Sequence, residues 1–227
     1  MKNVLMLMLV TATSFTQTNS AQQIFMSPDG MFQFRYPKSL VLCQPHFEEP
    51  TPHPDLPDDE QEEKHTLTGW APDSCGAYLS ICPGDALLVN ASGRWYVEPT
   101  ACIAYPSSAY EGTNFDGAAF SVSVLPYLTT EPSCLEDQAG AGKIHWGRVA
   151  GVKAKLSRNG EGGLSHGLGS DVYQLFRNGQ CYDVEIRLTQ TSPSVYDPGA
   201  IKVMNNHEEE RIHQKLKRIL NSFQFLK

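Results

Sequence analysis

Residues 172–189 read VYQLFRNGQCYDVEIRLT, and this stretch decides the fold. It predicts a β-hairpin, because Asn-Gly is the preferred two-residue connection between antiparallel strands and both of its positions need a positive φ. Strands over 172–177 and 180–189 then pair with Phe176 opposite Cys181 and Tyr173 opposite Val184. Successive side chains of a strand point to opposite faces, so one face is apolar and is expected to face the core. That face carries Tyr173, Leu175, Tyr182, Val184, Ile186 and Leu188.

The second face of this hairpin is polar. Asp183, Glu185 and Arg187 form a row of alternating charge, and Cys181 precedes them on the same face. The row could line a polar cleft, so the three residues are candidate ligand contacts. The alternative is a solvated row, or pairing with Lys153 or Lys155 of a neighbouring strand, because the exposed face of a sheet is normally charged.

The C-terminal segment predicts a helix that packs on the apolar face. Asn205 or Asn206 is placed to cap it, three glutamates follow in the first turn, and basic residues come late, an order that suits the helix dipole. One apolar stripe runs along the helix and predicts a buried side; it comprises Ile212, Leu216, Ile219 and Leu220. A short closing strand is expected over 222–225.

Strands are also expected earlier in the chain. Gln23–Met26 and Met31–Tyr36 flank Ser27-Pro28-Asp29-Gly30, a turn sequence. Residues 77–126 read mostly as strands. A short helix should follow, with Thr130 as its cap and Cys134 on its inner side.

The N-terminus predicts export. Lys2 precedes a short apolar run over 4–10, followed by a polar stretch and Ala21, the pattern of a signal peptide spanning residues 1–21. The run is far shorter than the ~20 residues that span a bilayer, so no membrane span is expected after cleavage. Residues 22–227 fit a single domain.

Six cysteines lie beyond the predicted signal. An even number in an exported chain indicates a disulfide framework, but it leaves the pairing open. The candidates are Cys43, Cys75, Cys82, Cys102, Cys134 and Cys181. Neither C-x-x-C nor paired histidine spacing occurs, so the sequence indicates no metal and no cofactor.

The net charge of the chain argues against some classes of binding partner. The chain has a formal net charge of −7, and an acidic protein is a poor match for nucleic acid or an anionic membrane. Much of the acid lies in a Pro-rich segment at about 48–64, which has little to bury and is expected to form an exposed loop.

Gly163-Leu164-Ser165-His166-Gly167 matches G-x-S-x-G, the nucleophile elbow of serine hydrolases. That chemistry needs a buried strand before the serine and a helix after it; here a polar glycine-rich stretch precedes and a strand follows. We therefore expect 158–170 to be a long mobile connection. His166 is a candidate ligand contact because binding residues often lie on loops.

Phe32-Gln33-Phe34-Arg35-Tyr36-Pro37, followed by Leu40, resembles the opening F-x-F-x-Y-P of the PsbP-like family, extrinsic photosystem proteins and their relatives. The later order of a strand over 120–124, a short helix, the hairpin and the last helix is similar too. The resemblance implies an α+β fold, an antiparallel β-sheet flanked by helices in a sandwich, here stabilised by disulfides. It also implies an accessory or binding protein without catalytic residues. The six cysteines and the acidic segment depart from the family pattern.

These observations predict a secreted or periplasmic, non-catalytic binding or accessory protein whose partner is a protein or a small molecule. The alternative is a secreted serine hydrolase that uses Ser165.

Overall fold

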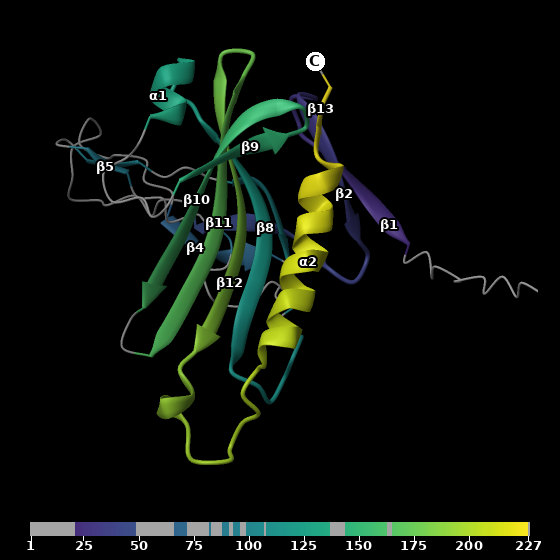
Figure 1. The fold of residues 1–227 in the computed structure, drawn as a ribbon, viewed down its shortest axis with the longest axis vertical. Helices are drawn as coiled ribbons and strands as arrows, with labels where there is room; N and C mark the ends of the chain where they lie inside the picture. Colours follow the sequence, from purple (N-terminus) through teal and green to yellow (C-terminus); the bar gives the residue numbers. More distant parts are fainter. Residues whose placement is uncertain are drawn as a thin grey trace, which may run out of the picture.

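The fold is built on an eight-stranded antiparallel sheet (Figure 1). The computed structural model describes residues 21–48, 66–71, 82, 88–90, 93–95, 99–106, 108–136, 144–162 and 165–226. The strand order of the large sheet is β4-β3-β7-β8-β12-β11-β10-β9. Its strands are β3 (Val41–Glu48), β4 (Thr66–Ala71), β7 (Pro99–Ala104), β8 (Phe115–Leu125), β9 (His145–Val149), β10 (Val152–Gly162), β11 (His166–Arg177) and β12 (Gln180–Thr191).

The predicted hairpin is confirmed as β11 and β12. Asn178 and Gly179 have φ values of 52° and 78°, and Phe176 pairs with Cys181 while Tyr173 pairs with Val184. The neighbouring strands β8 and β10 pair with β12 and β11 respectively. The hairpin therefore sets which side chains of the central strands face each side of the sheet.

The expectation of a mobile connection over 158–170 is wrong for its described residues. β10 continues to Gly162 and β11 begins at His166, with Gly160 opposite Gly169 and Gly162 opposite Gly167. Glycine weakens a strand through its conformational entropy, but here hydrogen bonding to the partner strand holds these residues extended.

One face of the large sheet is covered by α2 (Asn206–Ser222) and by a three-stranded sheet in the order β1-β2-β13. The latter comprises β1 (Gln22–Met26), β2 (Phe32–Pro37) and β13 (Gln224–Phe225). Asn205 caps α2, and the predicted stripe of Ile212, Leu216, Ile219 and Leu220 is buried. Phe32 packs on Tyr182 and Phe223, which joins the small sheet to both the large sheet and the end of α2.

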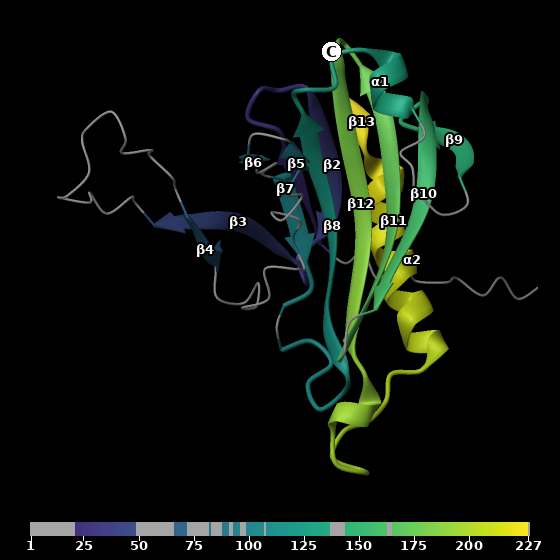
Figure 2. The same cartoon turned by 90° about the vertical axis from the view of Figure 1, so that its left-hand side faces the viewer.

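The predicted flanking of the sheet by helices on both faces is wrong. Figure 2 shows α2 on one side of the large sheet. On the other side, the only helix among the described residues is α1 (Glu131–Leu135), which has five residues. The described chain is mostly strand, so the predicted α+β class is wrong too, and the fold is not the PsbP-like sandwich of a sheet between helical layers. A two-stranded sheet of β5 (Leu88–Asn90) and β6 (Gly93–Trp95) and a short 3-10 turn at Pro193–Val195 complete the described elements.

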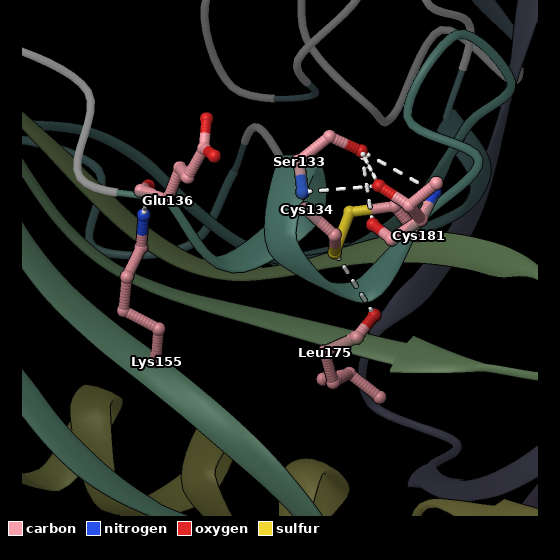
Figure 3. Close-up of a disulfide and its surroundings, with 7 residues drawn as sticks. Ser133, Cys134, Glu136, Lys155, Leu175 and Cys181 are labelled. Carbon is pink, nitrogen blue, oxygen red and sulfur yellow. Dashed lines mark hydrogen bonds between the residues drawn. A yellow bond between two sulfur atoms is a disulfide. The ribbon is translucent and has the colours of Figure 1, made fainter.

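Two disulfides join cysteines that both lie in the described residues, Cys134–Cys181 and Cys82–Cys102. The first ties α1 to β12, as Figure 3 shows, and confirms that Cys181 points away from the apolar face. Thr130 caps α1 in a capping box with Ser133, as expected for its cap. Cys43 is also disulfide-bonded, and Cys75 lies outside the described residues.

Other predictions fall outside the described residues. The predicted signal peptide, apart from Ala21, and the acidic segment, apart from Glu48, belong to this group. The described chain contains no helix with the length and apolar character that crossing a bilayer requires.

We expect the two disulfides to stabilise the protein unequally. Their cysteines are 47 residues apart for Cys134–Cys181 and 20 apart for Cys82–Cys102. Loop-closure entropy then predicts a loss of about 4 kcal/mol for Cys134→Ala/Cys181→Ala and about 3 kcal/mol for Cys82→Ala/Cys102→Ala. Urea unfolding of the two double variants measures both losses. Equal unfolding midpoints for wild type and the Cys134/Cys181 double variant would contradict the prediction.

Candidate functional site: a groove between the last helix and the sheet

A groove of about 470 Å³ lies where α2 crosses β10, β11 and β12. This volume falls within the range of small-molecule sites in proteins. Its floor includes the apolar residues Ile186, Leu188, Ile212 and Leu216, and charged residues stand around them.

Asp171 is the centre of the charged part. Its side chain is only 10% exposed, and its two oxygens accept separate hydrogen bonds. Arg158 Nε donates to Oδ1 at 3.0 Å, and Oδ2 lies 3.0 Å from His213 Nε2. The His213 hydrogen bond and the charge of Arg158 hold the pKa of Asp171 below its usual value, although burial opposes them. Asp171 is therefore ionised at neutral pH and fixes a cation and an imidazole side by side.

Strand alternation explains why Asp171 lies here. It is two residues before Tyr173, so it shares the inner face of β11, which packs against α2. His213 adjoins the buried Ile212 on α2 and is 30% exposed. The imidazole on α2 reaches the carboxylate on β11, and both residues line the groove.

The helix wall of the groove is acidic. Glu209 and Glu210 lie three or four residues before His213, about one turn away along the axis. Glu209 Oε1 accepts a hydrogen bond of 2.9 Å from Gln190, and Glu210 Oε1 accepts one of 2.6 Å from Gln214. Neither glutamate forms an ion pair within the described part of the chain. The groove thus has an arginine end, formed by Arg158, His213 and Asp171, and an anionic wall.

Gly169 leaves the sheet side of the groove open. It lies between Gly160 of β10 and Leu188 of β12, on the face that Asp171 also uses. A Cβ built at Gly169 would meet no heavy atom within 4 Å, and the residue needs no positive φ. Glycine inside a strand often marks a place where a ligand approaches closely.

The predicted contacts Asp183, Glu185 and Arg187 lie on the opposite face of the sheet. Arg187 Nε and Nη2 donate to the two oxygens of Glu185 at 3.0 and 3.1 Å, so these two residues form an ion pair with each other. Arg187 borders the groove, whereas Asp183 and Glu185 do not line it.

Asp183 is enclosed on that opposite face. Its Oδ1 is inaccessible to solvent and has no hydrogen-bond partner among the described residues. Burial and, to a smaller extent, the nearby Glu185 raise its pKa to about 7, although Arg187 and Lys155 act against this. Lys155, itself buried, donates to the carbonyl oxygen of Glu136 at the end of α1 (Figure 3).

His166 lies at the start of β11, away from those three residues. Its Nδ1 is 3.0 Å from Asp116 Oδ2 and 3.2 Å from the hydroxyl of Thr191, which also donates to Asp116. Within the described residues, no hydrogen bond joins the Ser165 side chain to a histidine, and His213 is paired with Asp171. The four candidate contacts from the sequence therefore do not form one site.

The groove offers hydrogen bonds, charge and an apolar surface. In the described ranges, no three histidine, cysteine or acidic side chains are grouped as metal ligands would be. The arrangement of Arg158, His213 and the two glutamates suits recognition of a charged ligand.

The sequence interpretation missed Asp171, Arg158 and Gly169 as site residues. The alternation of side chains along the strand offers a signal for Asp171. When the core face of the hairpin is extended by two residues before Tyr173, it includes this carboxylate. A charged side chain on a core face needs a partner, and the predicted C-terminal helix was the element that could supply one.

A scan against protein-family models and a search of curated proteins both find no match to this chain. The resemblance to the PsbP-like family has no support from these comparisons.

Replacing Asp171 should destabilise the protein in a pH-dependent way. Asp171→Asn removes a charged acceptor from two donors, at a cost of about 1–3 kcal/mol at pH 7. Because the folded-state pKa is lowered, this stabilisation is present above about pH 4 and is lost as the pH falls through the folded value. Urea unfolding between pH 3 and 7 measures the difference. Asp197→Asn, an exposed control, should show no such loss; a pH-independent cost for Asp171→Asn would contradict the prediction.

Replacing Asp183 should change the stability in the opposite direction and make the protein more stable at high pH. Its raised pKa means that folding favours the protonated acid, so its contribution to stability falls as the pH rises from about 4 towards 7. Asp183→Asn should match wild type near pH 4 and should melt at a higher temperature at pH 8. Melting curves across this range test it, and a lower melting temperature for the variant at pH 8 would exclude a neutral Asp183.

Proposed function

We propose that this protein is a non-catalytic binding protein, secreted or periplasmic, that holds a small ligand in the groove between α2 and the sheet. The observation that carries the proposal is the groove itself: an apolar floor bounded by charged residues, left open where β11 has Gly169.

The rigidity of the walls supports this proposal. The floor residues Ile212 and Leu216 are fully buried beneath α2, so the helix is anchored on the sheet. Arg158 and His213 are both held by Asp171 before any ligand arrives. A site whose groups are positioned in advance loses less conformational entropy on binding.

The export part of the proposal is supported by the sequence pattern at residues 1–21 and by the disulfides. Disulfides persist in oxidising compartments and are rare in the cytosol.

Filling the groove at Gly169 should abolish ligand binding without unfolding the protein. Gly169→Leu places a side chain in the open space while leaving the backbone conformation allowed. The measurement is saturation-transfer NMR with a panel of free amino acids, short peptides, dicarboxylates and monosaccharides. At least one class should give a signal with wild type, and that signal should disappear in Gly169→Leu.

Gly147→Leu is the matched control. Gly147 also lies in a strand and has no heavy atom within 4 Å of a built Cβ, but it does not line the groove. This variant should bind as wild type does, and both variants should retain their melting temperatures. A ligand signal equal in wild type and Gly169→Leu would place binding elsewhere and defeat the proposal.

A further inference from the structure

We infer that the ligand of this groove is a short apolar peptide with a free amino terminus and a free carboxyl terminus. This inference rests on the groove being the binding site, as proposed above, and adds the chemical class of the ligand. It follows from which groups in the groove already have partners and which do not.

The arginine end is suited to a carboxylate because it has donors that are free among the described residues. Arg158 uses Nε on Asp171, while its two Nη groups have no hydrogen-bond partner among the described residues, and its side chain is 67% exposed. His213 likewise uses Nε2 on Asp171, and no described residue bonds its Nδ1. The paired Nη groups of arginine match the two oxygens of a carboxylate. Asp171 positions this pair, since both of its oxygens are already bonded.

The anionic wall is suited to an ammonium group. Each of Glu209 and Glu210 accepts one hydrogen bond, from a neutral glutamine amide, at Oε1. Their second oxygens have no described partner and their charge is not neutralised by a described cation. A primary ammonium supplies both the charge and the donors that these carboxylates lack.

The space between the two ends is open at Gly169, and Leu188 is its partly exposed apolar residue. One helical turn separates Glu209 from His213, or about 5.4 Å along the axis. Leu188 and the open surface at Gly169 lie along the sheet side of the groove. An α-amino acid carries its two charges on one carbon, whereas a peptide of two or three residues separates them by roughly this span. An apolar side chain of the peptide then packs against Leu188, the partly exposed member of the floor.

Isothermal titration calorimetry with three forms of one dipeptide tests the inference: free Val-Leu, N-acetyl-Val-Leu and Val-Leu-amide. Charge-assisted hydrogen bonds predict that blocking either end weakens binding by about tenfold or more. Free leucine, which cannot span the groove, should bind more weakly than the free dipeptide.

Two variants assign the ends. Arg158→Met should weaken binding of the free dipeptide but leave the affinity of the amide unchanged, since the amide does not use that charge. Glu209→Gln should weaken the free dipeptide but not its acetylated form. Arg218→Met on α2 and Glu131→Gln on α1 are exposed controls outside the groove and should bind all forms as wild type does.

The outcomes separate the two proposals. If the blocked dipeptides bind as well as the free one, or if none binds while another class in the panel gives a Gly169-dependent signal, the peptide assignment is wrong and the groove remains. If no class gives a Gly169-dependent signal, the groove is not a binding site and both proposals fail.

Discussion

The positive φ values at Asn178 and Gly179 are the constraint on which the rest of the structure depends. They close the hairpin with only two residues and so fix the register of β11 against β12. Because side chains alternate with a period of two, a slip of one residue would exchange the two faces of the strand. Asp183 would then face the apolar stripe of α2, and Cys181 could no longer reach Cys134. One turn therefore determines the core, the disulfide to α1 and the side of the sheet on which Asp171 meets α2.

Much of this local structure could be predicted from the sequence, because local rules govern it. The hairpin register, the caps at Thr130 and Asn205 and the buried stripe of α2 all follow from neighbouring residues. The glycines at 160–169 were misinterpreted for the same reason: their local preference indicates a connection, while pairing with flanking strands makes them part of the sheet. The predicted layer of helices on the second face of the sheet was also wrong, because no local sequence pattern indicates what covers that face.

The groove was harder to predict than the fold because it depends on contacts between distant residues. Asp171 and His213 are 42 residues apart in sequence, and Arg158 comes from the part that was expected to be a mobile connection. The candidates that stood out, Asp183 with Glu185 and Arg187, attract notice as a charged row on one strand. The structure accounts for two of them as an ion pair with each other and for the third as a buried acid. A single carboxylate on an otherwise apolar face was the more informative signal.

Gly169 also bears on how such a protein can change over evolution. Each added carbon at this position would reduce the space in the groove, while the hydrogen-bond ladder of β11 would be unaffected because the backbone conformation is ordinary. Replacing glycine would even remove some of the entropy that the unfolded chain gains from it. In the proposed binding site, single substitutions here would therefore change the size of ligand that fits without loss of fold stability. Position 169 would act as a size filter that mutation can adjust independently of the scaffold.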